Sequence, residues 1–196
     1  RVGKLKPDCV VLVATIRALK LHGGVLFEEL DKENLEALRT GFENFEQHYY
    51  NLKKYGVPVV AAINHFAQDT KNEIELLEKL FNERSIKFAF LDGFLNGGNG
   101  SVELANKVVE TLHTTTSKYK PLYELEESIE AKIEKIGKEI YRARGVVYTD
   151  KALEDIKKIE SLGKSNLPIC IAKTPSSFSD DPKLLNCPKD WDLRVR

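Results

Sequence analysis

Three short segments of the sequence carry the side chains best suited to chemistry, and each follows a run of apolar residues. The first holds the cations Arg17 and Lys20, just ahead of the glycine pair Gly23 and Gly24. Cations beside glycines can bind a phosphate or a carboxylate, because glycine lets the main chain approach the anion closely. The alternative is a solvated turn, since lysine and arginine are mostly surface residues.

The second segment, residues 64–70, follows another apolar run. Asn64 offers both donors and an acceptor, and Asp69 can accept paired N–H groups, so the two suit the edge of a heterocyclic base. Phe66 lies between them in the sequence and offers a stacking face. The alternative is structural: Asp69 or Thr70 caps the next helix, Phe66 packs in the core, and Asn64 closes a turn.

The third segment, residues 93–100, contains four glycines together with Phe94. It leads to the N-terminus of an expected helix, a location that suits an anion. Its spacing differs from the G-x-G-x-x-G fingerprint, and the 196 residues contain no G-x-x-x-x-G-K-[ST] phosphate loop. We therefore name no catalytic residue and no metal ligand.

Alternating strands and helices must position these segments. Residues 9–16, 57–63 and 86–91 are short apolar runs, typical of strands buried in a parallel sheet, and we expect 9–16 to be a central strand. Helical periodicity covers residues 34–54, continues after a capping box of Thr70 and Glu73, and returns after Ser101, which is expected to cap a helix with a buried apolar face. Ligands of such sheets bind outside the carboxyl ends of the strands, where all three segments begin.

A polar stretch at residues 114–120 marks a boundary between two lobes, residues 1–118 and 119–196. The second lobe shows charged helices with apolar stripes at residues 129–140 and 153–159, followed by a strand-like run at 167–172. The predicted fold class is α/β, with a parallel sheet and helical crossovers in the first lobe and a second α/β lobe after it.

The composition excludes several classes of protein. Thirty basic and thirty acidic residues give zero net charge, so the chain lacks the basic face that nucleic acid or an anionic membrane would require. Three scattered cysteines do not make a disulfide scaffold or a zinc site. Neither a membrane span nor a signal peptide is visible, so we expect a cytoplasmic protein, with a mitochondrial location left open. The absence of methionine, even at position 1, suggests a piece of a longer polypeptide.

Several longer stretches together carry a family resemblance. They are KPDCVVLVATIRALKLHGG at residues 6–24, GVPVVAAINHFAQDT at 56–70, NLPICIAKT at 166–174 and SDDPKLL at 179–185. In these stretches the chain resembles formate–tetrahydrofolate ligases (10-formyltetrahydrofolate synthetases), alone or as the synthetase part of a C1-tetrahydrofolate synthase. The resemblance runs from about residue 4 to the C-terminus.

The resemblance implies that formate is activated by ATP, with Mg, as formyl phosphate and then transferred to N10 of tetrahydrofolate. Residues 1–118 would be the trailing part of a P-loop NTPase-like lobe. The pterin ring would lie between two aromatic rings, at positions that read Phe66 and Phe94 here, where the family has tryptophan at the second. Asn64 and Asp69 match the family, His65 stands where arginine is common, and Ala67 replaces the usual proline.

The phosphate loop of the family belongs to a portion that these residues do not include. Phosphoryl transfer depends on positioning and charge stabilisation by that loop and its metal, so we expect this chain alone to be inactive. Arg17 and Lys20 remain candidate anion contacts. The implied partners are the small molecules tetrahydrofolate, formate and ATP, and the intact enzyme is free to form a homo-oligomer. The alternative is a non-catalytic folate- or nucleotide-binding module that has lost the loop.

Overall fold

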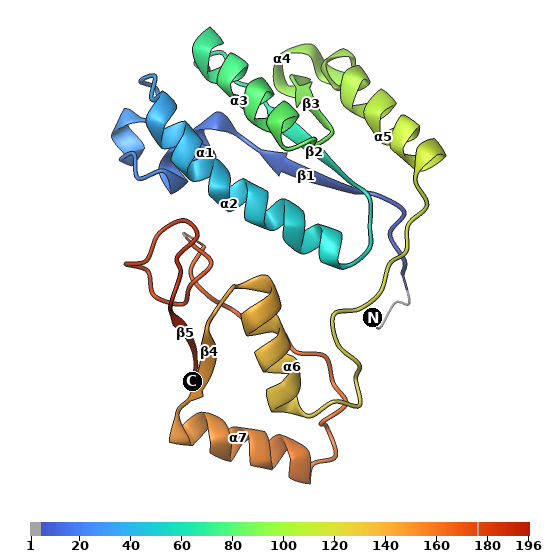
Figure 1. Cartoon of the computed structure of the whole chain (residues 1–196), viewed down its shortest axis with the longest axis vertical. Helices are drawn as coiled ribbons and strands as arrows, with labels where there is room; N and C mark the ends of the chain where they lie inside the picture. The colour runs from blue at the N-terminus through green and yellow to red at the C-terminus, as the bar shows by residue number, and fades with distance from the viewer. Residues whose placement is uncertain (1–4, 176) are drawn as a thin grey trace. The chain divides into compact units, whose positions relative to one another are not determined.

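The computed structural model describes residues 5–175 and 177–196 of the chain (Figure 1). Its contacts divide the chain into two compact units. One spans Lys6–Tyr119, and the other is formed mainly by Lys120–Arg196.

The unit of residues 6–119 is a parallel sheet with helical crossovers, as the strand-helix alternation predicts. Three parallel strands lie in the order β1-β2-β3, with Val10 opposite Val59 and Ala61 opposite Phe88 (Figure 1). The strands are β1 (Val10–Ala14), β2 (Val59–Asn64) and β3 (Phe88–Leu91). The α-helices are α1 (Ile16–His22), α2 (Leu35–Lys54), α3 (Lys71–Glu83), α4 (Gly93–Asn96) and α5 (Val102–Thr114), with 3-10 turns η1 (Phe27–Glu29) and η2 (Gly97–Ser101).

The core of this unit lies between the sheet and the apolar stripes of α2 and α3. Strand β2 is central, and its first five residues are buried. Phe42 and Phe45 of α2 pack edge-on against Phe81 of α3, with ring centroids 5.2 and 5.3 Å away. The predicted capping box is also present at the start of α3. The α/β fold class is thus confirmed, and its core is where the helical periodicity places it.

Strand β1 differs from the expected central strand, because it lies at the edge of the sheet. Its residues alternate between half-buried and exposed, with Val11 39% and Val13 56% exposed. Helix α5 packs mainly against β3 and β2.

The expected buried face of α5 is wrong, because none of its apolar residues is buried. Val102, Ala105, Val109 and Leu112 are exposed, and Leu104 and Val108 are half-buried. The Ser101 side chain also makes no capping hydrogen bond.

Helices α1 and α2 cross at a contact that requires glycine. A Cβ on Gly23 would lie 1.9 Å from the carbonyl oxygen of Ala37, and one on Gly41 would lie 1.7 Å from that of Leu19. Both neighbours are main-chain atoms, so a side chain at either position would force the helices apart. Gly23 therefore serves helix packing in this structure.

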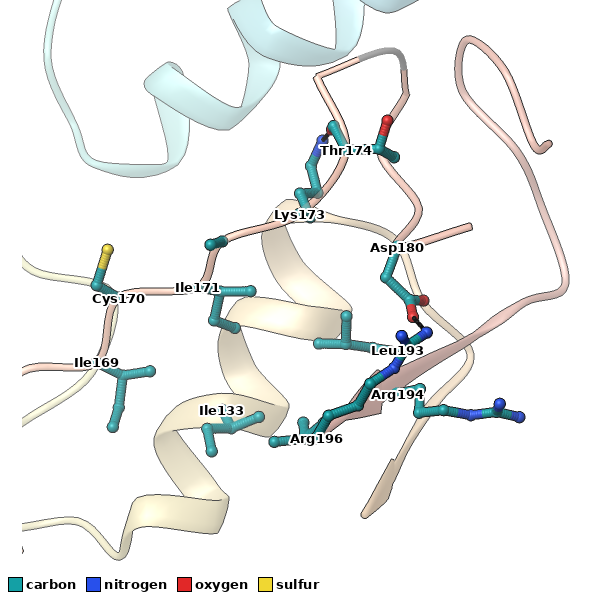
Figure 2. A pocket seen from close by; sticks show the side chains of 12 residues that line it. Ile133, Ile169, Cys170, Ile171, Lys173, Thr174, Asp180, Leu193, Arg194 and Arg196 are labelled. Atoms are coloured by element: carbon teal, nitrogen blue, oxygen red, sulfur yellow. Dashed lines mark hydrogen bonds and ion pairs between the residues drawn. The ribbon is translucent and has the colours of Figure 1, made fainter. Parts of the chain in front are cut away.

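The unit of residues 120–196 is built around a second, two-stranded parallel sheet. It contains α6 (Ile129–Lys135), which continues into a π-helical turn η3 (Ile136–Ile140), then β4 (Gly145–Tyr148), α7 (Asp150–Ser161) and β5 (Asp192–Val195). Its buried core includes Ile133, Ile156, Trp191 and Leu193. The strand expected at 167–172 is not formed (Figure 2), and the N–H of Ile169 donates to the hydroxyl of Tyr123 and not to a neighbouring strand. Strands β4 and β5 were not predicted.

Within the described part of the chain, no helix has the length and apolar character needed to cross a membrane.

Candidate functional site

The carboxyl ends of β2 and β3 border a hollow of about 390 Å³. The main chain ties the two strand ends together, because the N–H of His65 donates to the carbonyl oxygen of Leu91 over 2.9 Å. An apolar floor and a polar rim share the lining. It consists of His65, Ile74, Phe90, Asp92, Asn99, Gly100 and Glu103.

The rim beyond β3 is a tight turn organised by Asp92. The main-chain N–H of Asp92 donates to the carbonyl oxygen of Gly100 over 3.0 Å, and a Cβ on Gly100 would lie 2.0 Å from the carbonyl oxygen of Asp92. The side-chain Oδ2 of Asp92 accepts a 2.7 Å hydrogen bond from Asn96. Its Oδ1 is shielded from solvent and has no partner among the described residues. An unsatisfied buried acceptor of this kind costs about 1–3 kcal/mol.

The segment beyond β2 is held by Asp69. Its Oδ2 accepts a 2.8 Å hydrogen bond from the N–H of Phe66, and its own N–H donates to the carbonyl oxygen of Phe66. Burial raises the pKa of the Asp69 carboxyl, and the hydrogen bond from Phe66 opposes that shift. Thr70 then caps α3, accepting from the N–H of Glu73. In this structure the Asp69 carboxylate therefore shapes the loop that carries Phe66.

The two predicted stacking rings follow neighbouring strands, Phe66 after β2 and Phe94 after β3. Phe94 is in the short helix α4 and is 86% exposed, while Phe66 is half-buried in the loop after β2. Neither ring belongs to the lining of the hollow, and the ring contacts of the described residues include none between them. Asn64, also half-buried, ends β2 at the same edge.

The two predicted anion contacts after β1 are both neutralised by acidic side chains. Arg17 forms an ion pair with Asp31. Lys20 is buried, and its Nζ donates to Glu73 Oε1 over 2.8 Å and to the carbonyl oxygen of Lys32 over 3.0 Å. The geometry does not bring either cation to the hollow between β2 and β3.

Glu73 is a structural hub that connects three parts of this unit. Besides Lys20, its Oε1 accepts a 3.1 Å hydrogen bond from the N–H of Asn34, the N-cap of α2. Its Oε2 accepts from the N–H of Thr70, the N-cap of α3, also over 3.1 Å. The side chain is fully buried. One carboxylate thus anchors α1, the start of α2 and the start of α3.

The given sequence matches a known protein family over its whole length. The model of the family described as formate–tetrahydrofolate ligase matches residues 1–196, which includes both units. The chain belongs to the formate–tetrahydrofolate ligase family. This confirms the resemblance seen in the strand-end segments, and it places the chain among ligases of one-carbon metabolism that use ATP, formate and tetrahydrofolate.

The polar lining of the hollow contains residues that the sequence analysis of this ligase-family chain did not single out. Asp92, Asn99 and Glu103 come together here although none was predicted as a site residue. For Asp92 a signal was present, because it directly follows the apolar run at 86–91 and so must lie at the carboxyl edge. Nothing in the sequence pattern marked Glu103, whose position depends on the turn from 93 to 101.

The described residues contain no group of three or more histidine, cysteine, aspartate or glutamate side chains placed to hold an ion. Asp92 and Glu103 share the hollow with a single histidine, His65. A divalent cation prefers several converging oxygen ligands. The residues present therefore do not fit a resident metal.

Proposed function

We propose that residues 6–119 hold the pterin ring of tetrahydrofolate at the carboxyl edge of β2 and β3. The reaction they serve is the ATP-dependent formation of 10-formyltetrahydrofolate from formate through formyl phosphate. The observation that carries this proposal is the ring of Phe94, which is 86% exposed beside a strand-end hollow in a chain of the ligase family. Covering this ring with a flat ligand would remove apolar surface from water, which favours binding.

Stacking explains why aromatic rings are useful at this edge. A flat bicyclic ring gains from offset stacking on phenyl faces, in addition to the area that it buries. Phe94 supplies one face from α4, and Phe66 supplies the other from the loop that Asp69 holds. Asn64 and Asp69 are the proposed polar contacts to the ring edge, with Asp69 also fixing the position of Phe66.

The acidic rim of the hollow suits the N–H groups of a pterin. Asp92 Oδ1 is an acceptor without a partner among the described residues, and Glu103 lies on the same rim. A donor from the substrate would satisfy Asp92, because a carboxylate accepts up to four hydrogen bonds. In this proposal Asp92 orients the ring, and the pair of phenylalanines supplies most of the binding energy.

The residues present do not fit the phosphates of ATP. Lys20 and Arg17, the cations nearest to the strand ends in sequence, are already paired with Glu73 and Asp31. The sequence also contains no phosphate loop. We therefore assign neither nucleotide nor formyl phosphate to these residues. The chain alone is proposed to bind tetrahydrofolate without turnover, and ATP with Mg to act only in the complete active site.

Calorimetric titration of the 196-residue chain with tetrahydrofolate tests the proposal. Phe94→Ala and Phe66→Ala are each expected to weaken binding about tenfold, since an aromatic stacking contact contributes on the order of 1 kcal/mol beyond buried area. The matched control is Phe27→Ala, which removes another exposed phenylalanine, in η1. Unchanged binding in both edge variants would show that the pterin ring does not lie between these side chains.

An activity assay distinguishes a segment of a ligase from a non-catalytic binding module. The gene that encodes the chain is expressed in full and assayed for 10-formyltetrahydrofolate with ATP and formate. Product formation that is lost in Phe94→Ala supports the ligase. Binding of tetrahydrofolate by a full gene product that forms no 10-formyltetrahydrofolate supports the module.

A further inference from the structure

The turn after β3 contains all the Asn-Gly and Asp-Gly pairs of the sequence. They are Asn96–Gly97, Asn99–Gly100 and Asp92–Gly93. In such pairs the main-chain nitrogen of the glycine can attack the side-chain carbonyl carbon before it and close a succinimide ring. Glycine favours this step because it has no side chain to hinder the approach and because it adopts many main-chain conformations. The turn is therefore the part of the chain most open to this reaction.

Two of the three side chains are held by hydrogen bonds to each other. Asn96 Nδ2 donates to Asp92 Oδ2 over 2.7 Å, and the main-chain N–H of Asn96 donates to the carbonyl oxygen of Asp92 over 3.1 Å. Attack on Asn96 would also develop negative charge beside the Asp92 carboxylate, and like charges repel. The Asp92 carboxylate is itself a poor target for a nucleophile, because it has no neutral leaving group. Both positions are thus protected from ring closure.

Asn99 has neither restraint. Its side chain is exposed, and within the described residues no hydrogen bond or ion pair engages its amide group. It lies in the 3-10 turn η2, where three of the five residues are glycine. A turn so rich in glycine resists a change of main-chain conformation weakly. The Asn99 side chain is therefore free to turn toward the nitrogen of Gly100.

We propose that Asn99 is a site of spontaneous deamidation and that it reacts well ahead of Asn96. The nitrogen of Gly100 loses its proton and bonds to Asn99 Cγ, while the Cγ–Nδ2 bond breaks and ammonia leaves with that proton. Water then opens the succinimide. Opening at the side-chain carbonyl gives aspartate, and opening at the main-chain carbonyl gives isoaspartate, whose main chain contains an additional methylene. Water is the only co-reactant, and nothing is oxidised or reduced.

Either product changes the rim of the hollow between β2 and β3. An aspartate at position 99 adds a negative charge to a lining that already holds Asp92 and Glu103. An isoaspartate lengthens the main chain immediately before Gly100, whose carbonyl oxygen accepts the 3.0 Å hydrogen bond from the N–H of Asp92. Gly100 cannot move closer to Asp92, because even a Cβ there would lie 2.0 Å from the Asp92 carbonyl oxygen. The isoaspartyl form is therefore expected to lose this bond. The inference is independent of the proposed folate site.

The test is a rate measurement on the folded 196-residue chain in mildly alkaline buffer. Tryptic cleavage after Lys87 and Lys107 releases one peptide that contains all three pairs. Each deamidation adds about 1 Da to this peptide, and fragmentation in the mass spectrometer assigns the site. We expect Asn99 to react at least about tenfold faster than Asn96, because Asn96 must first give up a hydrogen bond to a charged group. Reaction of Asn96 at the rate of Asn99 would refute the proposal.

A synthetic peptide of residues 88–107 separates the effect of the fold from that of the sequence. Both asparagines precede glycine, so in the unfolded peptide they are expected to react at similar rates. If the peptide showed the same preference for Asn99 as the folded chain, the turn would not be its cause and the structural argument would fail. An Asn99 that stays intact in the folded chain while the peptide is converted would equally overturn the proposal.

A pair of variants locates the restraint at Asp92. Asp92→Ala removes the acceptor of the Asn96 side chain, so Asn96 is expected to react about tenfold faster and to approach the rate of Asn99. The matched control is Glu103→Ala, which removes the other acid of the same lining without touching the bond to Asn96. An Asn96 that reacts no faster in Asp92→Ala than in the parent chain would contradict the assigned protection.

Hydrogen exchange on the aged parent chain gives a readout that needs no variant. The N–H of Asp92 is expected to exchange at least about tenfold faster in the isoaspartyl fraction than in the unmodified chain, because its acceptor on Gly100 is displaced. Equal exchange in the two fractions would show that the modification leaves the turn intact, against the proposed change of the rim.

Discussion

Replacement of Glu73 by glutamine is the sharpest test of how the unit of residues 6–119 is stabilised. Glutamine keeps the size of the side chain and one carbonyl oxygen, which retains the acceptor for Lys20 and Asn34. The other oxygen becomes an NH₂ group that faces the N–H of Thr70, so donor meets donor. The ammonium of Lys20, only 2% exposed, also loses its counter-charge.

The expected cost follows from these losses. Removal of one partner from a buried ion pair costs about 3–5 kcal/mol, because the remaining charge is left uncompensated away from water. We therefore expect Glu73→Gln to lower the free energy of unfolding of this unit by about 3–5 kcal/mol. The exposed pair of Lys71 and Glu75, 3.6 Å apart, provides the control, and Glu75→Gln is expected to change stability by less than about 0.5 kcal/mol.

Native-state hydrogen exchange in urea, read by mass spectrometry on peptides from β1 and β2, measures this free energy for the unit itself. A double variant that carries Glu73→Gln and Lys20→Met removes both charges. Its loss of unfolding free energy is expected to be smaller, by at least about 1 kcal/mol, than the sum of the losses in the two single variants. Additive single effects, or a loss below about 1 kcal/mol for Glu73→Gln, would show that the buried pair is not what holds these helices.

Three further outcomes are expected. Gly41→Ala places a Cβ against the Leu19 carbonyl oxygen and should destabilise the chain by about 3 kcal/mol in urea unfolding. The hydrogen bond from Arg144 lowers the pKa of Asp192, so the stabilisation from this pair is present above the ordinary aspartate pKa and is lost as pH falls through the lower pKa of the folded state. The fluorescence of the single tryptophan should follow that loss of stability, and Asp192→Asn should abolish the pH dependence. Burial, together with nearby acidic side chains, raises the pKa of Tyr148 to about 12, so the free energy of unfolding falls as pH rises from 10 toward 12. An ultraviolet titration should show one tyrosine that ionises at higher pH than the others, and Tyr148→Phe should remove that step.

The parts of the fold that depend on local pattern could be predicted from the sequence. The helix at Leu35–Lys54 follows from its apolar stripe, and the capping box of Thr70 and Glu73 forms as its spacing indicates. Whether another element covers the second face of a strand depends on the tertiary fold, so the local sequence does not predict it. β1 has the composition of a buried strand, yet Val13 is exposed, since α5 packs mainly against β3 and β2.

The candidate site was only partly predictable for a related reason. Asn64 and Phe66 lie at the carboxyl edge of the sheet because they follow a strand, which the sequence shows. The pairing of Lys20 with Glu73 spans 53 residues and has no sequence signature, so Lys20 resembled a free anion contact. In the second unit β4 and β5 have four residues each and are separated by α7 and a long loop, which leaves periodicity nothing to detect.

The exposed valines of β1 have a practical consequence for work with this chain. Val11 and Val13 form an apolar strip on an edge strand, where main-chain donors and acceptors are also unsatisfied on one side. Such a strip attracts solvatochromic dyes and favours precipitation by kosmotropic salts. A lysine at position 13 should raise the concentration at which the chain stays in solution, because a charge on an edge strand opposes contact between molecules.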